Sequence, residues 1–471
     1  MNFLRKNFPW LIVILAAVFL IAVKWKHLFL PFYWDEGYPY AHAIHYLTEH
    51  RLTPFPSGMP EDLSTGHPTL FYFTAALWAK IFGATLFTAH LLPLLFSLCI
   101  LFVTFRFGKT FFNAETGMFA ALLLATRTIF IAQSTQQLPE TLITLLTLLA
   151  LHAWLKNRKW SYVLWCSLLV FTKESGLVLP AVLCLWELIS FFRHKISFAG
   201  FIRTRFHSAL PFTAALLFFV IQKMQKGWFF YPRHFGYMSF NMHDVYTKFW
   251  SGYSGHLFIF YGGILTTLIT LIALGFLLAR KIKITPVQRR SCAVIVLFLA
   301  GFIVFSALNF YSPRYILCMF PLWYLLAAFF IIEAFKRKTK LIPSIVLSAI
   351  SLVQIGYMID IKTYTDADLG YADVVQTQKN AIRWCVEHGY KDKEVFAVQF
   401  SHSMTSDAEG FLKKGEEFTH ITNQFTPNAS LLIFTCNQVD DREKEARKLP
   451  LKTLAKFTEG KAWTEICELQ K

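Results

Sequence analysis

Carboxylates are scarce in the first 361 residues, where the sequence has only twelve of them. Asp35 and Glu36 lie in the sequence Phe-Tyr-Trp-Asp-Glu-Gly-Tyr at residues 32–38, and Glu140 follows Pro139 at the start of an apolar run. A carboxylate can take the proton of a substrate hydroxyl and so act as a general base. Asp35 and Glu36 could instead be solvated acids in an aromatic belt at the membrane interface. Glu140 could be an acid that stabilises a helix N-terminus.

Two cationic side chains lie in comparable places. Lys173 separates two apolar runs, and Arg314 begins another. Lys and Arg bind phosphate through charge-assisted hydrogen bonds. Snorkelling of a long cationic side chain from a helix end explains each of them equally well. The positions of these acids and cations relative to the membrane therefore decide whether they form a site.

The composition indicates a membrane protein. Of the 471 residues, 55% are hydrophobic and 16% are charged, with a mean hydropathy of +0.44. The net charge of +17 comes from residues 1–361, because residues 362–471 hold 15 basic and 17 acidic side chains. Short cytoplasmic loops of membrane proteins accumulate Lys and Arg. Membrane topology therefore explains the charge better than nucleic-acid binding, for which no motif occurs.

Eleven apolar runs approach the ~20 residues that a membrane-spanning helix needs, and the adjoining runs at 160–173 and 175–192 are short candidates. They lie near residues 8–23, 86–107, 117–135, 139–156, 160–173, 175–192, 207–224, 256–279, 291–310, 314–333 and 341–360. We therefore predict a polytopic α-helical membrane domain over residues 1–361, with about eleven transmembrane helices in contact with membrane lipid.

The apolar segment at 68–85 decides the topology. If it does not span the membrane, the basic segments all face the cytoplasm, as the positive-inside rule requires. These segments are 106–109, 157–159, 193–205, 280–290 and 336–340. We therefore predict that 68–85 is interfacial or re-entrant, within a first outer loop over 24–85. The candidate acids and cations then gather at the outer face, which suits transfer from a membrane-embedded phosphate-linked donor.

Residues 362–471 have the composition of a soluble domain. A helical pattern covers Ala372–Glu387, and the short apolar runs Val395–Phe400 and Leu431–Thr435 predict strands. A charged helix is expected at Asp440–Lys448. We predict a small soluble α/β domain that lies on the outer, extracytoplasmic side.

An ordered series of motifs over about residues 1–335 resembles the GT-C superfamily of polyprenyl-phosphate-sugar glycosyltransferases. The resemblance is strongest to the protein O-mannosyltransferase-like and aminoarabinose-transferase-like branch. The series consists of Asp35-Glu36 with Tyr38, Gly-His-Pro-Thr-Leu-Phe-Tyr at 66–72, Ile-Phe-Gly at 81–83, Glu140, Lys173 in a Thr-Lys-x-x-Gly context, and Arg314-Tyr315 followed by Pro321.

The resemblance implies a GT-C fold with membrane-surface helices in the first outer loop. It also implies an inverting transfer of one sugar from a polyprenyl phosphate to a glycolipid, a cell-surface polysaccharide or a protein, at the periplasmic face of a bacterial inner membrane. Asp35 would be the general base, supported by Glu36, and Glu140 would be the second acid. The donor phosphate would be bound by Lys173 and Arg314, and substrate would be contacted by Tyr38, His67 and Tyr315.

Three positions depart from the family pattern. Glu140 stands where many members carry Asp, Thr69 replaces a second Pro, and His90 replaces an Arg at the start of the next span. The sequence indicates no definite cofactor, and a divalent metal stays possible. His67 could contact substrate or a metal, whereas His234 lies in a loop whose His spacing matches no metal signature, so we expect it to be solvated.

Two other functions stay open at this point. A transporter or flippase of a lipid-linked saccharide would carry acids within its spans along a path, whereas these acids lie at span ends and in loops. A non-catalytic membrane subunit would use residues 362–471 to bind a partner, and its outer acids would be structural. Transfer activity of the purified single chain distinguishes both from an enzyme.

Overall fold

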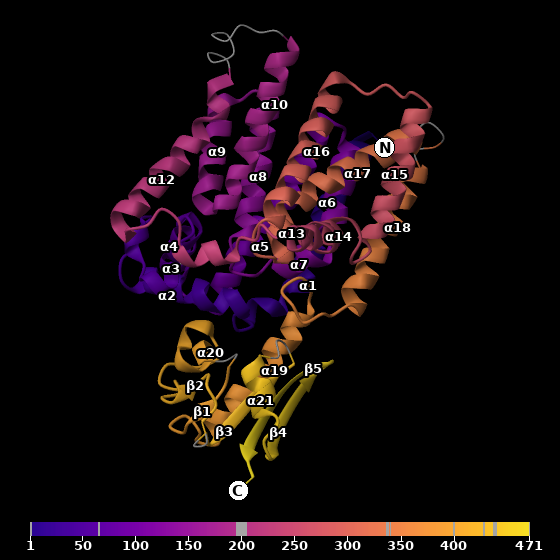
Figure 1. The fold of residues 1–471 in the computed structure, drawn as a ribbon. Coiled ribbons are helices and arrows are strands. Elements are labelled where there is room, and N and C mark those ends of the chain that lie inside the picture. The colour runs from indigo at the N-terminus through magenta and orange to yellow at the C-terminus, as the bar shows by residue number, and fades with distance from the viewer. Residues whose placement is uncertain are drawn as a thin grey trace.

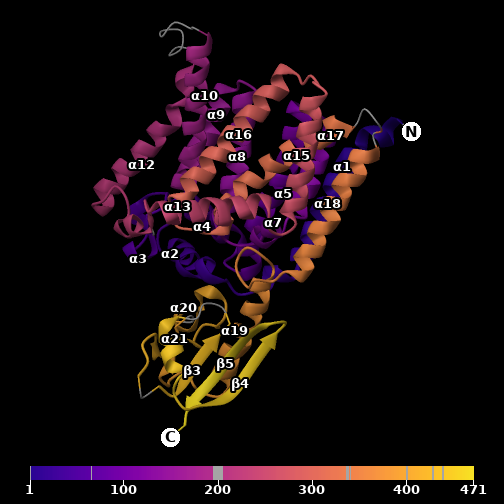
Figure 2. The same cartoon turned by 45° about the vertical axis from the view of Figure 1, so that its right-hand side comes forward.

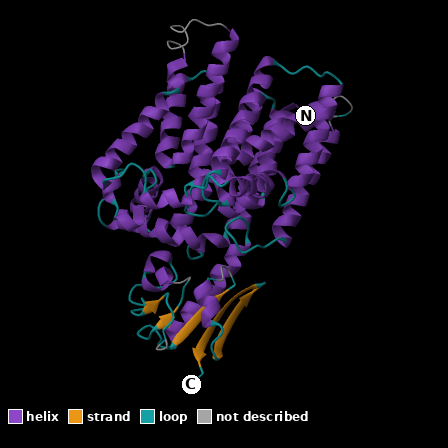
Figure 3. Ribbon diagram, viewed as in Figure 1, coloured by secondary structure: helices purple, strands orange, loops and turns teal. Residues whose placement is uncertain are grey.

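The computed structural model describes residues 2–470, except residues 65, 195–204, 336–338, 340, 399–400, 427–428 and 437–439. A bundle of helices is followed by a small domain that contains a sheet (Figure 1). In the described part of the chain, all strands belong to this C-terminal domain (Figure 3). Two basic segments predicted to face the cytoplasm, 193–205 and 336–340, fall mostly outside the described residues.

The bundle is that of a multi-pass membrane protein. Its long helices are α1 (Asn2–Lys24), α5 (Leu86–Phe111), α10 (Val178–His194), α12 (Leu210–Lys226), α16 (Pro286–Ala307), α17 (Phe320–Phe335) and α18 (Leu341–Asp360). By length and composition, seven helical stretches among the described residues could cross a membrane. An eighth is possible if Met242–Phe258 and α15 (Gly263–Ala279), bent by 82° from each other, form one broken span.

The structure therefore supports seven or eight spans by helix length, not the predicted eleven. The segment 139–156 forms α8 (Glu140–Leu155) of 16 residues, and 160–173 forms α9 (Lys159–Thr172) of 14 residues. The segment 117–135 is broken, because α6 (Ala114–Ala125) ends before Arg127 and a short α7 (Thr128–Gln133) follows. The Arg127 guanidinium donates hydrogen bonds to the backbone oxygens of Phe260 (2.9 Å) and Tyr261 (3.1 Å), so it belongs to a bend rather than to a span.

The first outer loop forms short helices: α2 (His42–Glu49), α3 (Glu61–Ser64) and α4 (Leu70–Phe82). The helix α4 has 13 residues and ends before Gly83, whose φ of +92° stops it. Thirteen residues are fewer than the ~20 of a typical span, although length alone does not separate α4 from the similarly short α6 and α9. Figures 1 and 2 place α2, α3 and α4 at the end of the bundle that faces the C-terminal domain, with the N-terminus and the α15–α16 connection nearer the other end. The position of α4 at the membrane surface stays a prediction.

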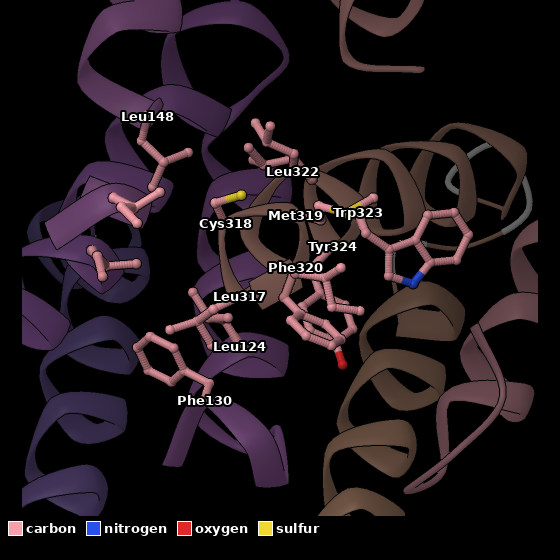
Figure 4. Packing of buried hydrophobic residues seen from close by; sticks show 14 of the residues in the cluster. Leu124, Phe130, Leu148, Leu317, Cys318, Met319, Phe320, Leu322, Trp323 and Tyr324 are labelled. Atoms are coloured by element: carbon pink, nitrogen blue, oxygen red, sulfur yellow. The ribbon is translucent and has the colours of Figure 1, made fainter. Parts of the chain in front are cut away.

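The helix α17 forms the centre of the bundle. In the apolar stretch Pro313–Phe335, 89% of an 18-residue apolar segment is buried, against 22% for Asn7–Lys24 of α1. Leu317 and Phe320 lie beside Leu124 and Phe130 (Figure 4). The stretch begins with η9 (Pro313–Met319), a 3₁₀ turn that carries Arg314. The best-buried part of the bundle therefore fixes the position of this arginine.

The C-terminal domain has a five-stranded mixed sheet with the order β2-β1-β3-β5-β4. The strands are β1 (Val395–Phe396), β2 (Ile421–Thr422), β3 (Leu431–Thr435), β4 (Leu451–Glu459) and β5 (Ala462–Leu469). The helices are α19 (Gly370–Glu387), α20 (Ser401–Thr405) and α21 (Asp441–Ala446). The predicted helix, the strand at 431–435 and the charged helix are confirmed. The strand predicted at 395–400 is only two residues long in the described part, and the β4–β5 hairpin was not predicted.

Close packing of α5 on α6 gives the first prediction. A Cβ on Gly117 would overlap the carbonyl oxygen of Phe105, so Gly117→Ala should destabilise the bundle by about 1–3 kcal/mol. In α15, a Cβ on Gly275 meets nothing within 4 Å. Gly275→Ala should therefore leave the protein as stable as the wild type or slightly more stable. Thermal unfolding in detergent, followed by tryptophan fluorescence, measures both variants. Equal melting temperatures for the two variants would contradict this packing.

Candidate active site

A cavity of about 1570 Å³ lies where the bundle meets the first outer loop and the linker to the C-terminal domain. Its charged lining consists of Asp35, Asp62, Glu140, Lys173, Glu174, Arg314 and Asp366. Tyr38, His67 and Tyr315 line the same cavity. All the predicted site residues except Glu36 therefore meet here, although they are spread over some 280 residues of sequence.

Arg314 holds three carboxylates together. Its guanidinium donates hydrogen bonds to the Oδ2 atoms of Asp35 and Asp366, and its Nε lies 3.8 Å from Oε1 of Glu140. The Arg314 side chain is 6% exposed. A buried guanidinium of this kind is stable only when it is paired. The first outer loop, the start of α8 and the linker after α18 therefore converge on one side chain.

A second cation lies beside the first. Lys173 donates a hydrogen bond from Nζ to Oε1 of Glu140 (3.1 Å), and its Nζ lies 3.9 Å from the ring centre of Tyr315. The other oxygen of Glu140, Oε2, is buried without a hydrogen-bond partner among the described residues. The cations Lys173 and Arg314 thus both approach the same oxygen of Glu140, Oε1, at the cavity wall. Two cations side by side suit a phosphate group.

The exposure of the acids separates their roles. The Asp35 side chain is 35% exposed, against 3% for Glu140. Asp35 lies in the short turn η2 (Trp34–Glu36). Of the paired acids around Arg314, Asp35 is thus the one most open to a bound hydroxyl group.

Glu36 points away from the cavity and is 1% exposed. Its Oε1 accepts a hydrogen bond from the backbone N–H of Gln137 (2.6 Å) and lies 3.0 Å from Nε2 of His90. Glu36 therefore anchors the turn that carries Asp35 to the helices behind it. His90, which departs from the family pattern, contacts Glu36 and does not line the cavity.

The C-terminal domain also reaches the site. Tyr38 stacks on His402 of α20 with ring centres 3.8 Å apart, and Nε2 of His42 lies 3.1 Å from Oε1 of Glu409. Asp366 comes from the linker between α18 and this domain. Sequence reasoning missed Asp366 because it is one of seventeen acids in the soluble tail. Its position only six residues after α18 is the one signal that could have pointed to it.

Three residues in the cavity wall could hold a metal ion. One ligand atom of each of His67, Glu174 and His234 lies within 4.8 Å of the others. His67 was a predicted site residue, but the expectation that His234 is a solvated loop residue is wrong. It packs against the ring of His67 with ring centres 4.9 Å apart. Loop folding, which sequence spacing does not reveal, brings these residues together.

Comparison with known proteins finds one family model and several solved structures that resemble this chain. Residues 66–221 match the family model described as dolichyl-phosphate-mannose-protein mannosyltransferase. Over these residues the chain is similar to that family of transferases. The match begins with the motif that contains His67 and includes Glu140 and Lys173. A search among curated proteins gives no significant match.

Solved structures share the fold of this chain. ArnT from Cupriavidus metallidurans in the apo state is 12% identical with a TM-score of 0.57, over 95% of this chain and 97% of ArnT. Bound to undecaprenyl phosphate, ArnT gives the same identity and TM-score over 98% of each chain. The oligosaccharyltransferase AglB from Archaeoglobus fulgidus, in complex with an inhibitory peptide and a dolichol-phosphate, is 12% identical with a TM-score of 0.53. That match covers 87% of this chain and 64% of AglB. At these identities the likeness shows the fold alone.

Arg314, which contacts three carboxylates of this chain, gives the second prediction. Arg314→Gln should destabilise the protein by about 3–5 kcal/mol, because it leaves the carboxylates around it uncompensated. Adding Asp366→Asn should restore part of the loss, since one of those carboxylates is then neutral. Thermal unfolding of the single and double variants measures the coupling. Arg383→Gln, which removes an exposed pair with Glu387, is the control and should have no measurable effect. Additive effects of Arg314→Gln and Asp366→Asn would contradict the pairing.

Proposed function

We propose that the chain transfers a single sugar from a polyprenyl-phosphate donor to a hydroxyl group of an acceptor, with inversion at the anomeric carbon. The acceptor is a glycolipid, a cell-surface polysaccharide or a protein. The observation that carries the proposal is the meeting of an accessible acid, Asp35, with two cations, Lys173 and Arg314, in one large cavity. The family match and the ArnT-like fold support the same donor class.

In the proposed reaction, the acceptor oxygen attacks the anomeric carbon from the side opposite the phosphate. The bond between that carbon and the phosphate oxygen breaks, and its electron pair leaves with the polyprenyl phosphate. Asp35 takes the proton of the acceptor hydroxyl group. A single displacement of this kind inverts the configuration of the sugar. The hydrogen bond from Arg314 orients Asp35, and Glu36 holds its turn in place.

Lys173 and Arg314 stabilise the negative charge that develops on the leaving phosphate. Preorganised cations in a site that excludes water are effective at this task, because they need little reorganisation during the reaction. Glu140 keeps both cations at the wall, since Lys173 and Arg314 each lie within 4 Å of its Oε1 atom. The unpaired Oε2 of Glu140 can accept a hydrogen bond from a hydroxyl group of the donor sugar. Tyr38 and Tyr315 contact the sugar through their rings.

The proposed function requires a membrane topology that places the cavity outside the cytoplasm. We propose that α6, α8 and α9 also cross the membrane, so that the bundle has eleven spans, and that α4 lies at the membrane surface. The cavity and the C-terminal domain then face the periplasm of a bacterial cell. The connection between α15 and α16, which is basic, lies at the opposite end of the bundle from this domain (Figure 1). That arrangement agrees with the positive-inside rule.

The general base gives the third prediction. Asp35→Asn should lower kcat for transfer by about 100-fold or more, because general-base catalysis is lost, while membrane insertion is retained. The assay uses the purified single chain with polyprenyl-phosphate sugars and measures the labelled product, whose anomeric configuration is read by NMR.

Glu49→Gln is the matched control for Asp35→Asn. It neutralises an exposed acid of the same outer loop and should leave kcat unchanged. Full activity of Asp35→Asn would remove Asp35 from the mechanism. Retention of the donor's anomeric configuration would contradict single displacement. No transfer by the wild-type chain with any donor, despite binding of polyprenyl phosphate, would favour a transporter or a non-catalytic subunit.

The topology gives the fourth prediction. In a cysteine-free background, Lys413→Cys in the C-terminal domain should react with a membrane-impermeant thiol reagent in intact cells. Lys156→Cys, between α8 and α9, should react only after the membrane is permeabilised. Both lysines are exposed in the folded chain. The reagent's access to the two introduced cysteines should therefore differ only because the membrane separates them. Protection of Lys413→Cys in intact cells would place the domain in the cytoplasm and contradict the outer-face site.

A further inference from the structure

The cavity has too little positive charge for the ligand that it is proposed to take. Among the described residues that line it, the carboxylates Asp35, Asp62, Glu140, Glu174 and Asp366 face only two cationic side chains, Lys173 and Arg314. Both of these cations are already paired with carboxylates. A phosphate-linked donor adds further negative charge, which like charges nearby repel. A bound cation at the cavity wall would remove this conflict.

His67, Glu174 and His234 form a group suited to such a cation. They come from three separate segments: the loop before α4, the turn η5 (Glu174–Leu177) and the turn η7 (Pro232–Tyr237). Nδ1 of His67 lies 2.8 Å from Oε2 of Glu174, and one ligand atom of His234 lies within 4.8 Å of both. All three side chains line the cavity, and Glu174 directly follows Lys173. The group is therefore adjacent to the proposed phosphate position.

The chemistry of these ligands selects the class of metal. Two imidazoles and one carboxylate are a typical donor set for Zn²⁺ sites that keep a fourth position open. Mg²⁺ prefers oxygen ligands and water, so two imidazoles disfavour it. The ligand atoms of the three residues all lie within 4.8 Å of one another, which is close enough for them to surround one ion.

We propose that His67, Glu174 and His234 bind a divalent cation of the zinc class, whose open position faces the cavity and takes a phosphate oxygen of the donor. The proposed binding of the cation rests on the geometry of these three residues alone. The phosphate contact rests on the proposed function. The rival explanation is a hydrogen bond between His67 and Glu174 with His234 packed against it, which would need no metal.

Co²⁺ is a suitable probe, because it occupies zinc sites and its visible absorption reports the ligands around it. The full chain is purified in detergent, its purification tag is removed, and any bound metal is stripped with a chelator. The protein is then titrated with Co²⁺. We expect saturable binding of one equivalent and an absorption band that added Zn²⁺ abolishes. His67→Ala and His234→Ala should each weaken binding by at least about 10-fold, since each removes one of three ligands.

His243→Ala is the matched control, because it removes an exposed histidine from the same outer loop and should not change Co²⁺ binding. Size-exclusion profiles verify that each variant is folded. If a histidine variant fails to fold, the wild-type titration still decides, since a metal site must also raise the melting temperature on addition of Zn²⁺. Lack of saturable binding by the wild type, or unchanged binding in both folded variants, would overturn the proposal.

A second titration separates this proposal from the proposed function. Binding of a polyprenyl phosphate to the wild-type chain is measured with and without Zn²⁺, and we expect it to be at least about 10-fold tighter with the metal. Metal binding without any effect on phosphate affinity would overturn the phosphate contact. If the metal binds but no sugar is transferred under any condition, the proposed function fails and the metal site stands.

Discussion

The need to neutralise one buried guanidinium organises the site. Arg314 begins the best-buried helical stretch of the bundle, and its partners come from the first outer loop, the start of α8 and the linker to the C-terminal domain. A charge removed from water costs several kcal/mol unless it is paired. Three segments far apart in sequence are therefore brought to one point, and the cavity forms around that point.

The C-terminal domain is part of the site rather than an appendage. Beyond Asp366, the domain contacts the outer loop through His402 on Tyr38 and through Glu409 beside His42. The buried Lys24 at the end of α1 donates a hydrogen bond to the hydroxyl group of Tyr371 (2.7 Å). These contacts hold the domain over the cavity wall that carries Asp35. The domain therefore limits the direction from which an acceptor can approach the proposed base.

Much of this architecture could be predicted from the sequence. The scarcity of acids in an apolar chain singled out Asp35 and Glu140, and the basic segments argued against a span at 68–85, which forms only a 13-residue helix. The rest depends on tertiary contacts. Polar packing around Arg127 divides the apolar run at 117–135 into α6 and α7. The Lys, Thr and Glu side chains along β4 gave no clear strand pattern for the β4–β5 hairpin. Asp366 and His234 are ordinary loop residues until folding places them at the cavity.

In the proposed reaction, this cavity holds the phosphate of a polyprenyl-linked donor between Lys173 and Arg314. The most direct test is an electron cryo-microscopy structure of the full chain in lipid nanodiscs with a polyprenyl phosphate bound. We predict that the phosphate contacts both cations and that the side chain of Asp35 faces the remaining open volume. A phosphate bound outside the cavity, with Arg314 still held by Asp35 and Asp366, would contradict the account.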